Sequence, residues 1–226
     1  MSGTTVAASP QTFTWSYSVL RNFETCPKRY YHYNVAKDVT EPETEQLREG
    51  NRLHKVFENR LKGEDLPLGF AHYEPLLRSV LNAPGVTYAE QKLAITSSFT
   101  PSGYFGKGVW FRTVIDCTKV RDTSATVLDW KTGKVSEDET QLKLMAATLF
   151  CHMPAVQRVK AALVFVNYDH AERAEYVRDD LTEIWGEILP RVKLVERARA
   201  AQHYPPTPSG LCKRYCAVIS CPFHGR

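Results

Sequence analysis

The pattern of apolar and polar positions predicts helices in the first third of the chain. Apolar residues recur every three or four positions through 17–23 and again through 53–61, which is the spacing of one buried helix face. Ser16 or Ser18 stands at the start of the first stretch, and a serine hydroxyl caps a helix by accepting a hydrogen bond from a backbone N–H of the first turn. A further helix is expected around 71–82.

Strand-like segments fill the middle of the sequence. Three runs, 86–96, 104–120 and 125–131, follow one another, and a helical pattern over 137–153 separates them from the strongly apolar segment 159–167. A short edge strand and a long helix complete the series. This order of elements predicts an α/β fold in which a mixed central β-sheet is flanked by helices.

Length and composition suit one globular domain with an appendage. The chain has 226 residues, 43% of them hydrophobic, and no apolar run approaches the ~18 residues that span a bilayer. We expect a flexible tail over 1–12, one domain over 13–203, and a cysteine-rich C-terminal segment over 204–226 that docks on this domain. No secretory signal precedes the domain, so we expect a cytoplasmic protein without membrane contact.

An acid and a base stand two residues apart where the third apolar run ends. Successive side chains of a strand point to opposite faces, so Asp129 and Lys131 share one face while Leu128 and Trp130 take the other. A carboxylate and an ammonium placed together suit the binding of a divalent cation and the positioning of a water molecule against a phosphate. An exposed ion pair on a strand would explain the same two residues.

A second segment mixes bases with aromatic side chains. Residues 28–33 read Lys-Arg-Tyr-Tyr-His-Tyr. They are consistent with a packed aromatic edge whose basic side chains reach solvent. They are also consistent with a surface on which single-stranded nucleic acid stacks. The net charge of +4 permits a nucleic-acid partner without requiring one.

Six cysteines occur in a chain without an export signal, and three of them cluster near the C-terminus. A reducing cytosol disfavours disulfides, so this cluster points to a metal. Cys117 and Cys151 lie apart, within a strand and at a helix end, and are expected to be core residues.

An ordered series of motifs resembles the PD-(D/E)XK nuclease superfamily, in particular its RecB-like branch. The matching motifs are the opening helix from Ser16 to Cys26-Pro27, the G-x-x-x-H of Gly50 to His54, the acidic Ile115-Asp116, the strand end Val127 to Lys134, and Gln141 on the helix that follows. The resemblance spans residues 16 to about 150. It implies a restriction-endonuclease-like core with a Cys-bearing C-terminal tail.

The resemblance also implies roles for these residues. Asp116 and Asp129 would be ligands of Mg²⁺ or Mn²⁺, with the carbonyl of Trp130 as a further ligand, and Lys131 would orient or deprotonate the attacking water or stabilise charge at the phosphate.

Three other positions have both a functional and a structural interpretation. By resemblance, His54 and Glu90 would complete the metal site or contact a phosphate, and Gln141 would hold Lys131 or the DNA backbone. The structural alternatives are a histidine beside the core, an exposed strand glutamate and an ordinary polar group at a helix N-terminus.

The cysteines resemble those of AddB-type and CRISPR-associated nucleases, in which one cysteine of the opening helix and three at the C-terminus ligate a [4Fe–4S] cluster. Cys26, Cys212, Cys216 and Cys221 match this layout in number and position, but their spacing differs from the usual close pair plus a wider gap. Thiolates also fit zinc, and small buried residues with free thiols are the third alternative. A second departure is Met145, where the family often has a tyrosine.

The resemblance predicts a metal-dependent DNA nuclease. We expect an exonuclease that hydrolyses DNA ends or single strands during recombination, repair or replication in a bacterial or phage-infected cytosol, with a helicase or recombination protein as its partner. The alternatives are a non-catalytic DNA-binding or scaffold module with a nuclease fold, and an RNA-directed nuclease. The sequence predicts neither the polarity of cleavage nor the oligomeric state.

Overall fold

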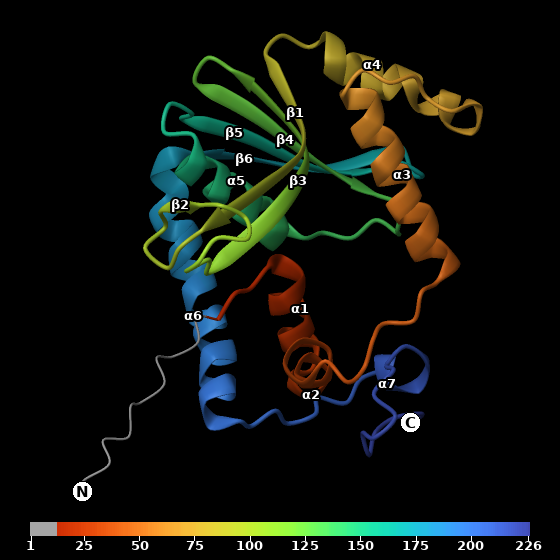
Figure 1. The fold of residues 1–226 in the computed structure, drawn as a ribbon, viewed down its shortest axis with the longest axis vertical. Helices are drawn as coiled ribbons and strands as arrows, with labels where there is room; N and C mark the ends of the chain where they lie inside the picture. Colours follow the sequence, from red (N-terminus) through yellow and green to blue (C-terminus); the bar gives the residue numbers. More distant parts are fainter. Residues whose placement is uncertain (1–12) are drawn as a thin grey trace, which may run out of the picture.

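A single six-stranded sheet, with strand order β2-β1-β3-β4-β5-β6, forms the centre of the protein (Figure 1). The computed structural model describes residues 13–226, so the tail expected over 1–12 lies outside the described residues. β4 and β5 are parallel and every other neighbouring pair is antiparallel, which confirms the mixed sheet. The strands are β1 (Val86–Ile95), β2 (Pro101–Ser102), β3 (Phe111–Arg121), β4 (Ser124–Lys131), β5 (Arg158–Phe165) and β6 (His170–Val177).

Helices flank the sheet, as the sequence pattern predicts. The helices of the described residues are α1 (Tyr17–Thr25), α2 (Pro27–Tyr30), η1 (Tyr31–Ala36), α3 (Glu45–Leu61), η2 (Leu68–Tyr73), α4 (Glu74–Asn82), α5 (Glu139–His152), η3 (Arg178–Asp180), α6 (Leu181–Ala201) and α7 (Leu211–Arg214), and α2 and α7 lie away from the sheet (Figure 1). Ser16 caps α1, since its Oγ accepts a hydrogen bond of 3.4 Å from Val19 N. None of the helices in 13–226 is long and apolar enough to cross a bilayer.

Two strand boundaries differ from the sequence-based prediction. β3 begins at Phe111, because the glycine-rich segment before it forms a loop around the two-residue strand β2. β6 begins at His170 and pairs with β5 along its whole length, so the edge strand is longer than the pattern predicts. Its first residues are polar because one side of an edge strand meets solvent.

Two hydrophobic cores hold the helices to the sheet. The larger one joins the sheet to α1, α5 and α6, and the smaller one joins it to α3, η2 and α4. Ile115 packs into the larger core, and Cys117, two residues on, packs into the smaller. Asp116 therefore lies on β3 at the junction of the two cores.

The basic and aromatic segment 28–33 is packed against its neighbours. Tyr30 is fully buried, and the ring of Tyr31 lies 4.9 Å from the ring of Tyr204 in the C-terminal segment. Arg29 pairs with Glu41 at 2.9 Å. These contacts agree with the packed-edge interpretation and leave few rings free for stacking on nucleic acid.

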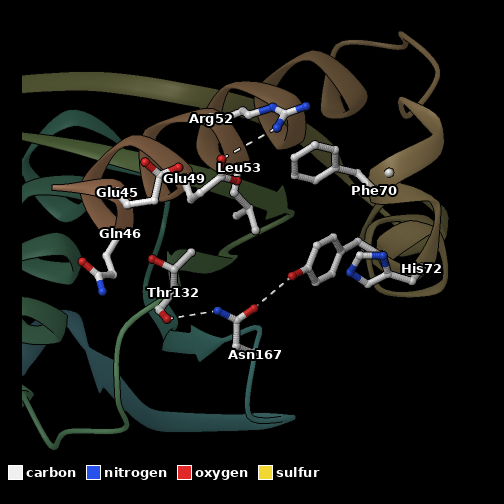
Figure 2. A pocket seen from close by; sticks show the side chains of 11 residues that line it. Glu45, Gln46, Glu49, Arg52, Leu53, Phe70, His72, Thr132 and Asn167 are labelled. Atoms are coloured by element: carbon white, nitrogen blue, oxygen red, sulfur yellow. Dashed lines mark hydrogen bonds and ion pairs between the residues drawn. The ribbon is translucent and has the colours of Figure 1, made fainter.

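A cavity of about 460 Å³ opens between α3, η2 and the ends of β4 and β5 (Figure 2). Thr132 follows β4 and lines this cavity together with Asn167, which follows β5. Because β4 and β5 are parallel neighbours, residues that follow them meet at the same edge of the sheet.

Candidate metal centre

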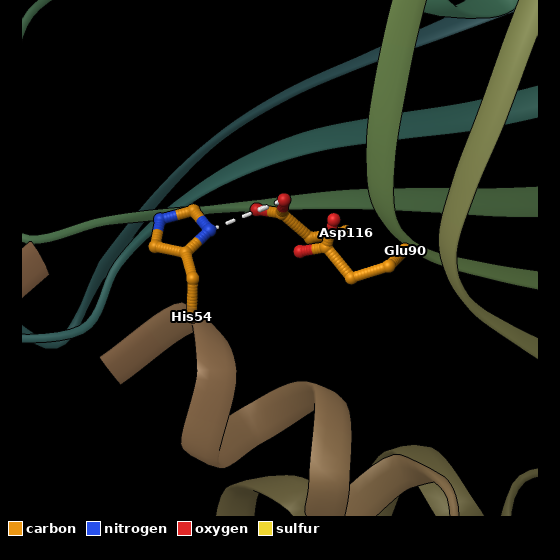
Figure 3. A group of neighbouring side chains, drawn as sticks. All are labelled: His54, Glu90 and Asp116. Carbon is orange, nitrogen blue, oxygen red and sulfur yellow. Dashed lines mark ion pairs between the residues drawn. The ribbon is translucent and has the colours of Figure 1, made fainter. Parts of the chain in front are cut away.

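Two carboxylates face each other across neighbouring antiparallel strands. The pairs Ala89–Cys117 and Gln91–Ile115 place Glu90 of β1 opposite Asp116 of β3. His54 of α3 points at them from outside the sheet (Figure 3). One ligand atom from each of these three side chains lies within 4.8 Å of the others, and His54 Nδ1 is 3.2 Å from Asp116 Oδ1.

Glu90 has an unusual backbone. Its φ is 50°, in the left-handed region that side chains with a Cβ rarely adopt and that costs about 1–2 kcal/mol. Like charges opposite each other on a sheet are also destabilising. The backbone of Glu90 and the repulsion between Glu90 and Asp116 therefore both destabilise the fold. Local strain of this kind is concentrated at functional sites.

A second acid, a base and an amide lie next to this group. Lys131 Nζ is 2.6 Å from Asp129 Oδ2, which confirms that these alternate residues of β4 share one face. Gln141 Nε2 donates to Asp129 Oδ1 at 2.6 Å. Trp130 N donates to Asp116 Oδ2 at 2.7 Å, so the backbone of β4 holds the carboxylate of β3 in place.

Burial and neighbouring charges shift the pKa values of Asp129, Glu90 and His54. Asp129 is almost fully buried, and burial raises its pKa to about 6 even though Lys131 opposes the shift. Burial, followed by the charge of Asp116, raises the pKa of Glu90. Burial alone would lower the pKa of His54, but its contact with Asp116 and the other nearby acids raise it.

The donor set fits a hard divalent cation. Carboxylate oxygens are the ligands that Mg²⁺ prefers, and Mn²⁺ accepts an imidazole beside them. The carboxylates of Glu90 and Asp116 lie with the imidazole of His54, and Asp129, which is buried like Asp116, pairs with Lys131 beside them. A bound cation would reduce the repulsion between the carboxylates.

Local interactions bring α3 and α5 to this site. Gly50 permits the approach of α3, because a Cβ there would lie 3.1 Å from Thr132 Oγ1. Asp138 caps α5 by accepting a hydrogen bond of 3.3 Å from Gln141 N. This cap places Gln141 in the first helical turn, where its side chain reaches Asp129.

The structure brings together most of the residues that the sequence singles out. They are His54, Glu90, Asp116, Asp129, Lys131 and Gln141. The ring of Trp130 points the other way and is buried against Phe57. Met145 is fully buried, so it contributes apolar packing and no polar contact.

Sequence reasoning missed two features beside the metal group. Asn167 Nδ2 donates to the carbonyl of Thr132 at 3.1 Å and ties the end of β5 to the end of β4. Its signal in the sequence is a polar residue two positions after a buried strand. The left-handed φ of Glu90 has no sequence signal, since glutamate gives no preference for that conformation.

The four cysteines of the expected cluster lie together at a separate place, where the C-terminal segment meets α2. Cys26, Cys212, Cys216 and Cys221 line one cavity of about 20 Å³. Thr207 N donates to Cys26 Sγ and Ser209 N donates to Cys212 Sγ, both at 3.4 Å. Within the described part of the chain, no three cysteine sulfurs approach within 4.8 Å of one another.

Comparisons with known proteins agree with this geometry. The model of the PD-(D/E)XK nuclease superfamily matches residues 14–84 and 71–222. A solved structure described as a "Putative exonuclease" from Eubacterium rectale is 11% identical, with a TM-score of 0.53, over 99% of this chain and 94% of that one. The structure of SSO0001 is 16% identical, with a TM-score of 0.51, over 97% of this chain and 90% of that one. No protein with a curated description matches the sequence.

Proposed function

The chain belongs to the PD-(D/E)XK nuclease superfamily, and we propose that it is a metal-dependent DNA nuclease of the RecB-like branch. The observation that carries this proposal is the site itself. His54, Glu90 and Asp116 converge within 4.8 Å, and Lys131 lies 2.6 Å from Asp129 beside them. A module that only binds DNA has no need for carboxylates held at this cost in stability.

Glu90, Asp116 and Asp129 would hold the cation, with His54 beside them. The cation supplies charge neutralisation at the phosphate and a lower pKa for bound water. Lys131 is near enough to orient the attacking water or to neutralise charge on a phosphate oxygen. Gln141 fixes the Asp129 carboxylate, and Trp130 N fixes that of Asp116, so that both acids keep their orientation when a substrate enters.

Hydrolysis of the phosphodiester forms one phosphorus–oxygen bond and breaks another. The attacking water loses a proton as its oxygen bonds to phosphorus, and the leaving sugar oxygen takes up a proton as its bond breaks. The proton of the water passes to solvent. Lys131, on the same strand face as Asp129, is the ammonium group placed to supply the second proton.

We propose an exonuclease acting on DNA ends or single strands. This proposal rests on the resemblance to RecB-like nucleases. The printed description of the Eubacterium rectale neighbour supports it, although that likeness concerns the fold. The same site chemistry would serve an endonuclease or an RNA-directed nuclease, so the substrate test below includes both.

We further propose that the four clustered cysteines bind a [4Fe–4S] cluster, with zinc as the alternative. The position of Cys26 beside the three C-terminal cysteines supports a shared metal group. Four thiolates are a ligand set for either group, and the likeness of the cysteine layout to that of AddB-type and CRISPR-associated nucleases supports the cluster.

The proposal is tested with end-labelled single-stranded, linear duplex and closed circular DNA, and with a labelled RNA of the same sequence. Each is incubated with Mg²⁺, Mn²⁺ or EDTA. Loss of linear DNA with circles spared, only in the metal lanes, is the expected result. Nicked circles would identify an endonuclease, and cleavage of RNA alone would overturn the choice of DNA. No cleavage in any lane by folded, metal-loaded protein would favour the non-catalytic module.

A further inference from the structure

The cavity between α3, η2 and the ends of β4 and β5 adjoins the metal group without being part of it. Thr132 lines it and directly follows Lys131, while Leu53 lines it and directly precedes His54. One residue of extended chain covers about 3.3 Å. A nucleotide whose phosphate lies at the metal group could therefore place its base in this cavity.

One wall of the cavity is aromatic. Phe70, His72 and Tyr73 come from the six-residue helix η2, and the ring centres of His72 and Tyr73 lie 3.9 Å apart (Figure 2). The guanidinium of Arg52 lies 5.0 Å from the centre of the Phe70 ring. Aromatic rings and guanidinium planes are the surfaces on which unpaired bases stack, and every base has such a face.

The opposite side of the cavity carries amide groups on a fixed frame. Tyr73 Oη donates to Asn167 Oδ1 at 3.0 Å, and Asn167 Nδ2 donates to Thr132 O at 3.1 Å. This chain of hydrogen bonds ties the aromatic wall to the residue after Lys131. Gln46, across the cavity, is exposed and has both a donor and an acceptor for the edge of a base.

The charged groups that line the cavity are mainly negative, so they disfavour binding of the phosphate backbone. Its charged lining groups are the carboxylates of Glu45 and Glu49 and the guanidinium of Arg52, so carboxylates outnumber cations. Glu49 and Arg52 also pair with each other at 3.7 Å. A phosphodiester would be repelled here, whereas a neutral base with amino groups would not.

We propose that this cavity binds one unpaired base of the DNA strand, from the nucleotide next to the scissile phosphate. The proposal rests on the nuclease function proposed above and adds its substrate class, since a base in a closed duplex cannot enter without leaving its stack. Single strands and frayed ends are then cut faster than closed duplex. The volume of about 460 Å³ is within the range of small-molecule sites.

The test uses a single-stranded oligonucleotide with one stable abasic residue, and the rate of cleavage at each bond is measured with Mg²⁺. Wild-type protein is expected to cut the bond next to the abasic residue about tenfold more slowly than the same bond in the intact strand, the order expected for one lost stacked base. An equal rate at both bonds, from protein that does cut DNA, overturns the base site and leaves the nuclease function intact.

The matching test changes the protein instead of the DNA, by filling the cavity with a tryptophan side chain. A Cβ at Gly69, which lines the cavity, meets nothing within 4 Å, and the same is true of Gly103 in the loop before β3. Gly69→Trp is expected to slow cleavage of intact single strands about tenfold. It is also expected to cut the bond next to the abasic residue at the same rate as that bond in the intact strand. Gly103→Trp is expected to match wild type in both respects. If the Gly69→Trp protein still cuts next to the abasic residue more slowly than in the intact strand, as wild type is expected to do, the proposal is contradicted.

Binding without cleavage separates the two proposals. The affinity of the intact and abasic oligonucleotides is measured by fluorescence anisotropy in EDTA, for wild type and Gly69→Trp. Weaker binding of the abasic strand by wild type alone supports the base site even if no DNA is cut. Equal binding of both strands by a protein that cuts neither removes the base site and the nuclease function together.

Discussion

Glu90 and Asp116 lie opposite each other on β1 and β3, and His54 points at both carboxylates. Glu90 reaches this position with a φ of 50°, so both its charge and its backbone oppose folding. The arrangement is understandable where a divalent cation is held. A bound cation would return the stability that the metal-free protein loses here.

This cost can be separated into charge and backbone by two substitutions of Glu90. Glu90→Gln removes the charge and is expected to stabilise the metal-free protein. Glu90→Gly also removes the Cβ that opposes a positive φ, and is expected to add about 1 kcal/mol to the stability of Glu90→Gln. Urea unfolding in EDTA measures both differences.

The control for the backbone effect is Asp122→Gly, since Asp122 has a φ of 52° but is exposed in a turn. It is expected to gain stability without a change in nuclease activity, whereas both Glu90 variants are expected to lose activity. A Glu90→Gln protein less stable than wild type in EDTA would contradict the repulsion between the two carboxylates.

Burial of Asp129 predicts a pH dependence. Its pKa is 3.8 as an ordinary aspartate and about 6 in the folded protein, so the folded state holds the proton more tightly. The stability that this proton confers is fully present below 3.8 and is lost as the pH rises through about 6. At about 1.4 kcal/mol per pKa unit the loss is at most roughly 3 kcal/mol.

Asp129→Asn removes this titration. In EDTA it is expected to be more stable than wild type above about pH 7, with the difference shrinking towards about pH 4. Added Mg²⁺ is expected to raise the melting temperature of wild type and to have little effect on the variant. A stability difference that does not change with pH would show that burial does not control the protonation of Asp129.

Much of the site could be predicted from the sequence because strand alternation and motif order are local. Asp129 and Lys131 are two residues apart on one strand, so their shared face follows from the pleat alone. The order of strands and helices along the chain was also enough to predict a mixed sheet. The position of Gln141 in the first turn of a helix follows from the cap at Asp138 and the helical pattern after it.

Other features depend on contacts between distant segments. The opposition of Glu90 and Asp116 requires the register of β1 against β3, which a single sequence does not fix. The cavity beside the site requires the packing of η2 against the end of β5, through Tyr73 and Asn167. No local pattern signals that contact, because both residues are ordinary polar groups at the ends of elements.

Gln141 is expected to act by positioning Asp129. Gln141→Ala removes the donor of the 2.6 Å hydrogen bond, and a loss of about 10- to 100-fold in kcat is expected, as is usual when the partner of a metal ligand is removed. Gln141→Glu is expected to be worse, since a second carboxylate would repel Asp129. Equal activity of the alanine variant and wild type would contradict this role.

Gly50 is expected to set the distance between α3 and β4. Gly50→Ala would place a Cβ 3.1 Å from Thr132 Oγ1, and the shift of α3 and His54 is expected to lower kcat about tenfold. Thr132→Ala in the same protein removes the clashing atom and is expected to restore most of the activity.

Gly186→Ala is the control for helix propensity, because Gly186 lies within α6 and a Cβ there meets nothing within 4 Å. It is expected to gain about 1 kcal/mol in stability with unchanged kcat. If Thr132→Ala restores nothing to the Gly50→Ala protein, the close contact is not the cause of the loss.

The cysteine cluster is tested by anaerobic purification. Brown protein with broad visible absorbance, iron and acid-labile sulfide is expected, and Cys216→Ser is expected to lose all three. Cys151→Ser is the matched control, since Cys151 lies in α5 outside the cluster cavity. Colourless wild-type protein with stoichiometric zinc would establish the alternative, and protein without either metal would refute both.

The central claim is that Lys131 and the acids beside it cut DNA with the help of a divalent metal. The most direct test compares Lys131→Met with Lys134→Met, a change of the exposed lysine three residues further along the chain. The measured quantity is the rate of Mg²⁺-dependent cleavage of single-stranded DNA by protein that still binds the strand. The account predicts that Lys131→Met loses at least about a hundredfold and that Lys134→Met stays near wild type. Equal rates for the two variants would contradict it.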